Sequence, residues 1–514
     1  MACEINYAAT ARNARSTGSG FFLTGAGGVR FQTGQANRQS GRTAAAVLWY
    51  SDENKCLSET KLSGSSRTLA VIGGGLAGIA AAETAARQGR QPVIFERASV
   101  LGGRAASLPE PVRKVWIDNG QHLLLGCCTE MLALNRRLGL DRFFQQTDTL
   151  PFYNVQNQCW NLSASRLLPV SLQFLPALLT MPFLPFSERL KTGYLLQKLV
   201  KEDFFRANLP AKTVADWLRQ HWVPQKTRDS FWDPLILSAL SETADHTAAA
   251  ALQKVVRDVF FAGRGGMTLH LPIVPLREIY HDAVLNPLTK LGISFRFFKR
   301  LRRLHWEKKN SAVEITAVEF SDGSTEQFDD YVFAVPAFAL WKVLNDSGLS
   351  DTAERLGLNR FEPGSISTVH LWLDRPLLNG RKCGVLLGGD GQFLCCCKES
   401  DHYYTVVVSA SHRILPDAEM TASGSRMLVE RILEQLRAVF GCSPLRAVHA
   451  RVTVRFDAVF SPGISVFANR ERFDVPVGRL FSNAGIAGDW VLPDYPATLE
   501  SAVRSGNLAG KDRF

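Results

Sequence analysis

The alternation of apolar and polar positions first becomes regular near residue 68. Residues 69–72 form an unbroken apolar run, which is typical of a strand covered on both faces. An alanine-rich helical pattern follows directly, and a second apolar run covers residues 93–95 and is followed by Glu96. This order predicts a βαβ unit with parallel strands, and therefore an α/β fold for the first part of the chain.

The pattern changes further along the chain. Residues 162–261 have helical periodicity and are rich in Leu, Phe and Trp. The later apolar and aromatic runs, broken by Gly and Asp turns, predict strands over residues 293–297, 313–320, 331–336, 366–374, 383–397, 403–410 and 447–456, with a helix over 420–440. We therefore expect a second, α+β part, with an antiparallel sheet, inserted into the α/β part.

Three glycines join the first strand to its helix in the spacing Gly73-x-Gly75-x-x-Gly78. The first allows a tight turn, the second lets the backbone approach a pyrophosphate, and the third lets the helix lie close to the strand. The start of the helix then presents free N–H groups to the phosphates. Glu96 lies 18 residues after Gly78, close to the spacing of an acid that binds ribose hydroxyls. Together these features predict a dinucleotide site.

Two further motifs indicate which dinucleotide. Glu96-Arg97 leads into Leu101-Gly102-Gly103-Arg104, and residues 481–490 form an apolar strand that ends in Gly488-Asp489. In this order the motifs resemble the FAD-dependent amine oxidase and phytoene desaturase superfamily, over residue 67 to the C-terminus. The resemblance implies a Rossmann-like (GR2-type) FAD-binding domain, with an inserted α+β substrate domain and non-covalent FAD.

The resemblance also assigns roles. Arg104 would lie along the FAD phosphates, Asp489 would hold the ribityl or pyrophosphate region, and the backbone at Leu301 would contact adenine. A helix starting near Thr498 would direct its N-terminus at the flavin and stabilise negative charge on reduction. The implied cofactor-binding residues are Gly73, Gly75, Gly78, Glu96, Arg97, Gly103, Arg104, Leu301, Gly488, Asp489, Thr498 and Leu499.

The same resemblance implies the domain limits. The FAD-binding domain is expected to be discontinuous, over residues 67–150, 262–345 and 475–514. The substrate domain is expected over residues 151–261 and 346–474. Residues 1–66 match nothing in the superfamily and contain Glu4 as the only acid before Asp52. We expect them to be a disordered extension, although their composition is also compatible with a transit peptide.

Residues 118–126, 231–235 and 487–490 resemble a narrower, squalene-associated branch that contains the bacterial hydroxysqualene dehydroxylases. This implies reductive dehydroxylation of hydroxysqualene to squalene by hydride transfer from reduced flavin. His122 and Asp118 are the candidate proton donors, because their motif is expected to pass near the flavin ring. Two alternatives stay open: a carotenoid or phytoene-type desaturase or other isoprenoid or amine oxidase, and a non-catalytic flavin-binding, membrane-associated subunit. The motifs do not name the electron donor.

Composition limits the cellular compartment and the classes of ligand that we expect. With 46% hydrophobic and 21% charged residues the chain can bury a large core. Its ten cysteines are scattered and form no CxxC pair, so we expect no metal site and free thiols in a reducing, cytoplasmic compartment. Basic clusters such as residues 299–303 lack any accompanying recognition motif, so we expect no nucleic-acid partner.

Residues 167–186 are almost wholly apolar but contain four prolines, which break any regular spanning helix. Two interpretations remain: an apolar surface or cavity wall that dips into one leaflet, and a buried helical hairpin. In the first, Phe174, Leu178 and Leu179 would belong to a membrane-facing entrance of the substrate cavity. The flanking Arg and Lys residues and the net charge of +11 would suit an anionic bilayer. We therefore expect a lipophilic isoprenoid substrate and peripheral attachment to the inner face of the plasma membrane.

Overall fold

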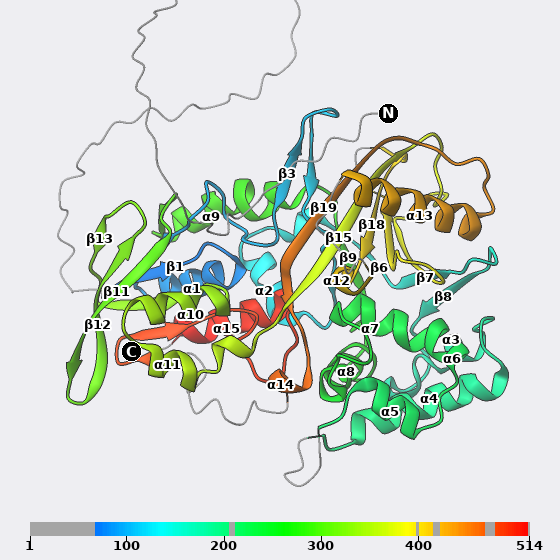
Figure 1. Cartoon of the computed structure of the whole chain (residues 1–514), viewed down its shortest axis with the longest axis horizontal. Coiled ribbons are helices and arrows are strands. Elements are labelled where there is room, and N and C mark those ends of the chain that lie inside the picture. Colours follow the sequence, from blue (N-terminus) through cyan, green and yellow to red (C-terminus); the bar gives the residue numbers. More distant parts are fainter. Residues whose placement is uncertain (1–66, 205–210, 397–399, 415–421, 468–478, 512–514) are drawn as a thin grey trace, which may run out of the picture. The chain divides into compact units, whose positions relative to one another are not determined.

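A six-stranded sheet forms the centre of the first part of the fold (Figure 1). The computed structural model describes residues 67–204, 211–396, 400–414, 422–467 and 479–511, so the extension expected over residues 1–66 lies outside the described residues. The sheet order is β10-β2-β1-β14-β21-β20, and only the β20–β21 pair is antiparallel. The strands are β1 (Thr68–Ile72), β2 (Gln91–Phe95), β10 (Ser294–Arg296), β14 (Asp330–Phe333), β20 (Arg479–Phe481) and β21 (Ala484–Ile486).

Two helices from opposite ends of the chain lie side by side next to this sheet: α1 (Leu76–Arg87) and α15 (Leu499–Lys511). Glycines allow their close approach. A methyl group on Gly506 would come within 2.2 Å of the Ala77 carbonyl oxygen, and one on Gly510 within 2.4 Å of the Ala81 oxygen. Because the two contacts follow the same order in both helices, α1 and α15 run parallel and begin at the same edge of the sheet.

Other helices and a three-stranded meander complete this part. The helices are α2 (Thr129–Arg137), α9 (Val284–Lys290), α10 (Ala337–Asp346) and α11 (Ser350–Arg355). The antiparallel meander is β11 (Leu301–Lys309), β12 (Ala312–Phe320) and β13 (Thr325–Glu326). Strand β11 was not predicted, because most of its side chains are charged and exposed, and only Leu304 is fully buried.

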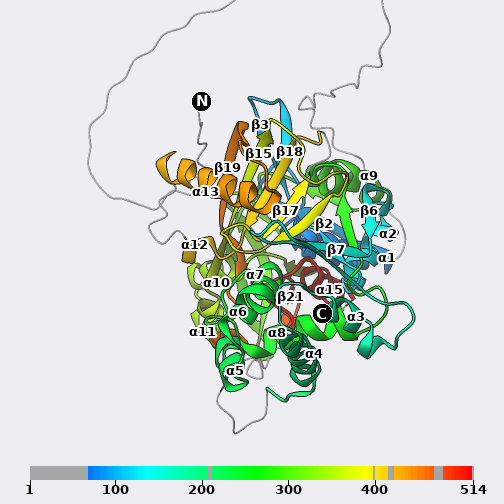
Figure 2. The ribbon, with the colours of Figure 1, turned by 90° about the vertical axis from the view of Figure 1, so that its right-hand side faces the viewer.

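A seven-stranded, mainly antiparallel sheet forms the second part, in the order β19-β15-β18-β17-β16-β7-β8. Its strands are β7 (Thr149–Tyr153), β8 (Cys159–Ser163), β15 (Pro363–Leu373), β16 (Cys383–Leu386), β17 (Phe393–Cys396), β18 (Tyr403–Val408) and β19 (Ala447–Phe460). Helix α13 (Ala422–Phe440) covers one face, where Leu428, Ile432 and Leu436 share a core with β15 and β18 (Figure 2). These strands and this helix confirm the predictions over residues 366–456.

A helical region follows β8, as the periodicity of residues 162–261 predicts, and gathers below the large sheet in both ribbon views. Its helices are α3 (Leu175–Leu179), α4 (Phe186–Lys201), α5 (Val214–Gln220), α6 (Gln225–Thr227), α7 (Asp233–Leu240) and α8 (Ala249–Val256). π-Helical turns lie at Arg228–Trp232, Arg257–Phe261 and Glu278–Ala283. Small sheets pair β3 (Ser107–Glu110) with β4 (Val115–Asp118), and β9 (Leu269–Pro272) with β5 (Leu124–Leu125) and β6 (Phe144–Thr147).

The apolar stretch 167–186 is divided in the structure. Phe174 and Leu178 are buried in the core, at 6% and 5% exposure, because α3 packs against α4 and β8. Leu167 and Leu172 are exposed. The buried interpretation therefore holds for the middle of the stretch, and an entrance built from Phe174 and Leu178 is wrong. Within the described residues, no helix is long and apolar enough to cross a membrane.

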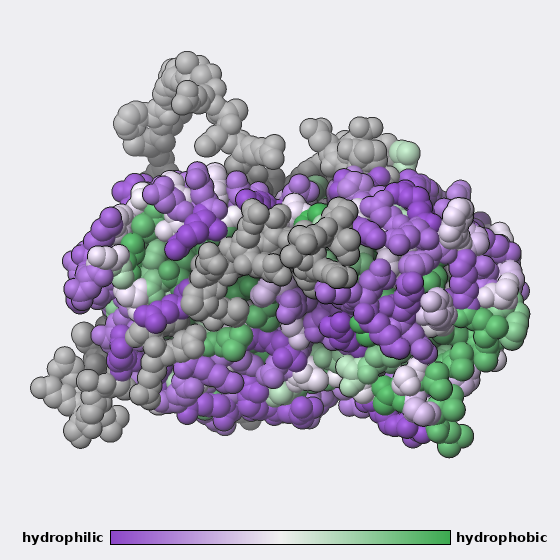
Figure 3. Space-filling model, turned by 90° about the horizontal axis from the view of Figure 1, so that it is seen from below, coloured by the Kyte–Doolittle hydropathy of each residue, from purple (hydrophilic) through white to green (hydrophobic). Residues whose placement is uncertain are grey.

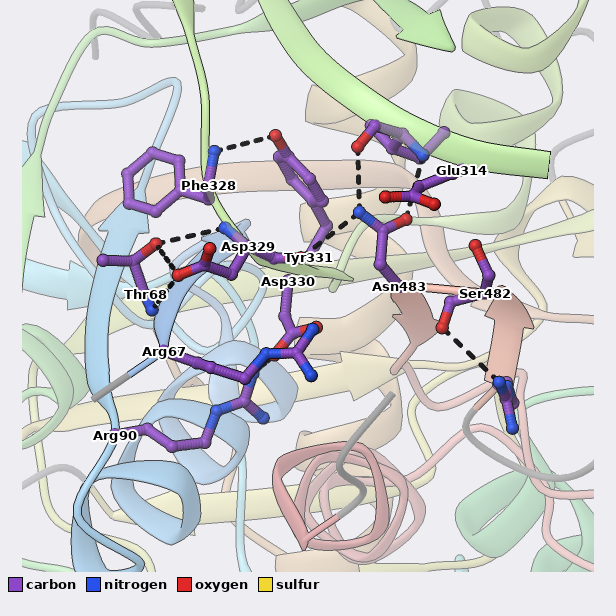
Figure 4. Close-up of polar contacts among 12 residues, drawn as sticks. Arg67, Thr68, Arg90, Glu314, Phe328, Asp329, Asp330, Tyr331, Ser482 and Asn483 are labelled. Atoms are coloured by element: carbon purple, nitrogen blue, oxygen red, sulfur yellow. Dashed lines mark hydrogen bonds and ion pairs between the residues drawn. The ribbon is translucent and has the colours of Figure 1, made fainter. Parts of the chain in front are cut away.

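Polar contacts fasten the beginning of the described chain to the six-stranded sheet (Figure 4). Arg67 and Arg90 both pair with Asp330, whose side chain is 1% exposed. The backbone N–H and hydroxyl of Thr68 both donate to Asp329 Oδ2, at 2.7 and 2.8 Å. A buried carboxylate with two guanidinium partners is held in place far more firmly than an exposed ion pair, so β1 begins at a fixed point.

Candidate active site

The first glycine loop has the geometry that its spacing predicts. Gly73 has a φ of +114°, and its N–H donates to the Phe95 carbonyl at 2.8 Å. A methyl group on Gly78 would come within 1.9 Å of the Gly73 oxygen, so the helix lies directly against the turn. Gly75 differs, because its φ is −73° and a methyl group there would meet only Gly103 Cα, at 3.8 Å. The fold needs Gly73 and Gly78, whereas Gly75 leaves space beside the loop.

The Gly-Gly-Arg loop closes over this space. Gly102 donates its N–H to the Gly74 carbonyl at 2.9 Å, and both Gly102 and Gly103 have positive φ. The Leu101 N–H donates to Nδ1 of His281 at 3.3 Å. His281 was not predicted, since a single histidine in a helical stretch carries no motif. It positions the second loop against the first.

Glu96 lies at the end of β2 and is 8% exposed. Its Oε2 accepts the Gly74 N–H and its Oε1 accepts the Ala98 N–H, both at 2.8 Å. The Lys299 N–H donates to the Glu96 carbonyl at 2.8 Å, which brings the segment leading to Leu301 alongside. Arg97 is exposed next to it. The structure thus assembles Glu96, Arg97 and Leu301 in one place, and each carboxylate oxygen retains a lone pair for a hydroxyl donor.

Arg104 and Asp489 meet although they lie at opposite ends of the sequence. Arg104 Nη2 is 2.6 Å from Asp489 Oδ1, and Arg104 Nη1 donates to the Ala458 carbonyl at 3.0 Å. Burial acts to lower the pKa of Arg104, but the charges of Asp489 and Asp457 more than offset it and the pKa is raised. A permanently charged guanidinium therefore stands beside the two glycine loops.

The C-terminal motif sets the start of α15 beside this pair. The Gly488 N–H donates to Ser505 Oγ at 2.9 Å, which ties the Gly-Asp turn to the helix. Thr498 caps the helix, because its Oγ1 accepts the Ser501 N–H at 3.1 Å. Helix α15 then begins at Leu499, as predicted. Its first free N–H groups give this edge of the sheet a second positive helix end.

His122 lies near Arg104 in a short loop that begins directly after Asp118, the last residue of β4. His122 Nδ1 lies 2.8 Å from the Gly120 carbonyl oxygen, so the ring is assigned as the Nδ1–H tautomer and leaves Nε2 open. Burial lowers the pKa of His122 and Arg104 lowers it further, although Gly120 and Asp118 oppose this. Asp118 Oδ1 accepts the Ser107 hydroxyl at 2.7 Å and the Leu276 N–H at 2.8 Å. Asp118 thus braces the loop that carries the imidazole.

This loop is also in contact with the seven-stranded sheet. The Thr405 hydroxyl donates to Gln121 Oε1 at 3.3 Å, and Thr453 Oγ1 lies 3.5 Å from the Asn119 carbonyl oxygen. A methyl group on Gly120 would come within 3.7 Å of Thr368 Oγ1. Sequence reasoning missed these threonines, because threonine alternating with apolar residues is ordinary strand composition. They join the flavin-type motifs to the sheet of the second part.

The residues fit a bound FAD. The space beside Gly75 is bordered by glycines, so a pyrophosphate could reach the backbone N–H groups at the start of α1. Arg104 supplies a fixed positive charge, and Glu96 supplies acceptors for ribose hydroxyls. FAD would be held by these groups together with Asp489 and the start of α15.

Comparisons with known proteins agree with this geometry. The family model of flavin containing amine oxidoreductases matches residues 76–511. The chain is 24% identical to a hydroxysqualene dehydroxylase of Zymomonas mobilis, over 85% of this chain and 97% of the relative. It is 21% identical to a 15-cis-phytoene desaturase of Synechococcus elongatus, over 86% and 95%. The solved structure of cyclohexylamine oxidase from Brevibacterium oxydans has the same fold, with a TM-score of 0.63, 16% identity and coverage of 87% and 98%.

The matched region begins at the start of α1, directly after Gly75, and contains the Gly-Gly-Arg loop, the Gly-Asp turn and α15, together with strands of both sheets. The fold is therefore a Rossmann-like FAD-binding fold with an inserted α+β substrate domain. This chain belongs to the flavin containing amine oxidoreductase family and is an FAD-dependent oxidoreductase.

Proposed function

We propose that this chain converts hydroxysqualene to squalene by reductive dehydroxylation. The observation that carries the proposal is the segment over residues 118–122, where the half-buried imidazole of His122 stands near Arg104 and the neighbouring Gln121 accepts a hydrogen bond from Thr405 of the sheet. A second support is the hydroxysqualene dehydroxylase relative, which this chain matches along nearly its whole length. A phytoene-type desaturase is the second candidate, because the phytoene desaturase relative is matched to almost the same extent.

The reaction needs a proton as well as a hydride. The hydroxyl of hydroxysqualene is allylic, so breaking its C–O bond leaves a delocalised cation on carbon and releases oxygen as water once it is protonated. Reduced FAD, when bound, supplies the hydride that neutralises the carbon. The protein must therefore deliver one proton to the leaving oxygen, exclude bulk water and hold the reacting carbon in place.

His122 is our candidate for the proton donor. Its Nδ1–H is directed at the Gly120 carbonyl, so Nε2 is the atom that would carry and release the proton. Because burial lowers its pKa, the protonated ring would be a stronger acid than an exposed histidine. Asp118 could also donate, but its contacts with Ser107 and Leu276 favour a positioning role.

The substrate class follows from the same proposal. A lipophilic isoprenoid is nearly insoluble in water, since each buried CH₂ favours an apolar phase by ~0.8 kcal/mol. We therefore propose that the protein works at a membrane surface and acts peripherally, on the cytoplasmic side. The domain limits given in the sequence analysis remain predictions, and the limit at residue 474 lies outside the described residues.

Anaerobic reoxidation tests the function. The enzyme is reduced, mixed with hydroxysqualene in detergent, and followed by flavin absorbance while the product is identified by mass spectrometry. We expect the flavin to reoxidise and squalene to form in equal amounts. Introduction of double bonds into phytoene by the oxidised enzyme, without squalene formation, would instead support a desaturase. Retained flavin with neither reaction would support a non-catalytic subunit.

A further inference from the structure

Helix α4 presents apolar side chains on two faces. Its inward face buries Leu195, Leu196 and Leu199 in the core. Its outward face carries Phe186, Leu190 and Tyr194, which are 61%, 47% and 63% exposed. These three lie four residues apart and therefore form one stripe along the helix. An ordinary surface helix has polar side chains on its outer face, so the outward stripe needs a separate explanation.

Trp222 adds to this stripe. Its residue is 86% exposed, and its φ of +52° is a conformation that bulky residues rarely adopt. Lys191 of α4 donates from Nζ to the Trp222 carbonyl at 2.6 Å, which joins the Trp222 turn to the helix. In Figure 3 the hydrophobic surface gathers at the right, where α3 and α4 lie in Figure 1. A large apolar side chain that is exposed and held in an unfavourable backbone conformation indicates that the Trp222 indole contacts a binding partner.

The net positive charge of α4 indicates that the binding partner of this surface is anionic. Helix α4 carries Arg189, Lys191, Lys198 and Lys201 against a single acid, Glu188. Glu188 is directed inward, where it accepts the Thr227 hydroxyl at 3.0 Å and lies 4.0 Å from Lys191. Aromatic and leucine side chains beside lysines are the composition of helices that lie in the interface of an anionic bilayer. In a symmetric dimer through this face the same basic helices would meet and repel one another.

We propose that the outward stripe of α4 together with Trp222 is a docking surface for an anionic membrane. This inference rests on the proposed function, since a membrane is where a lipophilic isoprenoid is found. It replaces the entrance predicted at Phe174 and Leu178 with residues that are exposed. In this arrangement α4 lies flat on the headgroups, with Phe186, Leu190, Tyr194 and Trp222 below them and Lys198 and Lys201 beside the lipid phosphates.

Vesicle sedimentation of the full-length FAD-bound protein tests the surface. The probes are vesicles of phosphatidylglycerol with phosphatidylcholine, and vesicles of phosphatidylcholine alone. We expect binding to the anionic vesicles, weakened by high salt, and at least tenfold loss of affinity in the Phe186→Ser, Leu190→Ser, Tyr194→Ser variant. The control is Phe338→Ser with Trp341→Ser, which removes exposed aromatics from α10 and should leave binding unchanged.

Two measurements and a second variant keep the outcomes apart. Flavin absorbance and thermal unfolding show whether the triple variant is folded, and Trp222→Ser alone repeats the test with a milder change. Equal vesicle binding by wild type and both variants would overturn the proposal. A wild-type dimer that the variant separates would assign the surface to a second copy of the chain. Turnover in detergent is expected to be unchanged, so absent turnover there would contradict the proposed function and not the docking surface.

Discussion

The two glycine loops and the seven-stranded sheet are built under different constraints. At the loops the backbone itself forms the site, so a single methyl group at Gly78 would collide with the Gly73 oxygen at 1.9 Å. At the sheet the buried side chains need only fill space, and Val369, Leu371, Val406 and Val408 could exchange with one another at small cost. A site formed by the backbone therefore requires glycine at fixed positions, and this spacing can be recognised in the sequence. A cavity lined by apolar side chains requires only suitable volumes, and no particular residue pattern identifies it.

The largest effect is expected from replacing Gly78. Gly78→Val would place a branched side chain within the turn formed by Gly73 and against Ala334, both of which are fixed by the sheet. We expect a loss of stability above about 4 kcal/mol and little soluble protein. Expression level and thermal unfolding measure this.

Gly75→Val is the matched variant three residues earlier. Its φ of −73° suits valine and its Cβ would meet only Gly103 Cα at 3.8 Å, so the apoprotein should fold. The added methyl groups would occupy the space assigned to the pyrophosphate, and flavin occupancy should fall below about one tenth of wild type, a cost of at least ~1.4 kcal/mol. Full flavin content in a folded Gly75→Val protein would show that the phosphates lie elsewhere.

This contrast explains what the sequence could and could not predict. The turn at Gly73, the start of α15 after Thr498 and the strands around the flavin motifs were predictable because each depends on a local pattern. The ion pair between Arg104 and Asp489 was not predicted, because the family resemblance assigned each residue separately to FAD and no local pattern connects the two segments. His281 and Thr405 were missed, since their positions come from long-range packing and not from local spacing.

A prediction for the sheet concerns His370, which is fully buried between Tyr403 Oη at 2.9 Å and Thr453 Oγ1 at 3.3 Å. Burial, with the charge of Arg451, lowers its pKa to about 3. The folded protein therefore keeps the His370 ring neutral at pH values where the unfolded chain, with a histidine pKa near 6.5, already binds a proton. The contribution of the neutral ring to the free energy of unfolding is complete above pH 6.5. It is lost as the pH falls toward 3, by about 1.4 kcal/mol per unit.

Urea unfolding at pH 7 and pH 5 measures this effect. The wild type should lose about 2 kcal/mol more than His370→Gln between these two values, because glutamine does not titrate. Other buried histidines are present in both proteins and cancel in the comparison. An identical pH dependence in the two proteins would show that His370 is accessible to protons in the folded state.

Replacing either member of the Arg104–Asp489 ion pair should have an effect of similar size, but on FAD binding. Asp489→Asn removes the charge that raises the pKa of Arg104, and Arg104→Met removes the guanidinium. Each change should weaken FAD binding by about ten- to a hundredfold, or about 1.4–2.8 kcal/mol. If both groups act on the same phosphates, the double variant should lose less than the sum, as measured by flavin titration of the apoprotein. Strict additivity would mean that the two residues bind FAD independently.

His122 provides a kinetic test with an expected effect of about tenfold or more. If its protonated ring is the donor, turnover should rise as the pH falls, with a midpoint below 6.5, because burial lowers the pKa of His122. His122→Gln should be slower and should not show this rise. A variant that keeps the wild-type pH profile would assign the proton to another group. An unchanged flavin spectrum in the variant confirms that the cofactor site is intact.

The smallest effect is expected at the beginning of the chain. A protein that starts at Ser65 keeps Arg67 and Thr68, and with them the contacts to Asp330 and Asp329. We expect its stability to lie within about 0.5 kcal/mol of the full chain, with unchanged flavin content and turnover.

A protein that starts at Leu69 loses both contacts and leaves Asp330 with Arg90 alone. Its free energy of unfolding should therefore fall by about 1–3 kcal/mol, and its thermal unfolding should occur several degrees lower. Equal unfolding temperatures for the two truncated proteins would show that the contacts in Figure 4 contribute little, and loss of soluble protein on removing residues 1–64 would show that the extension is part of the fold.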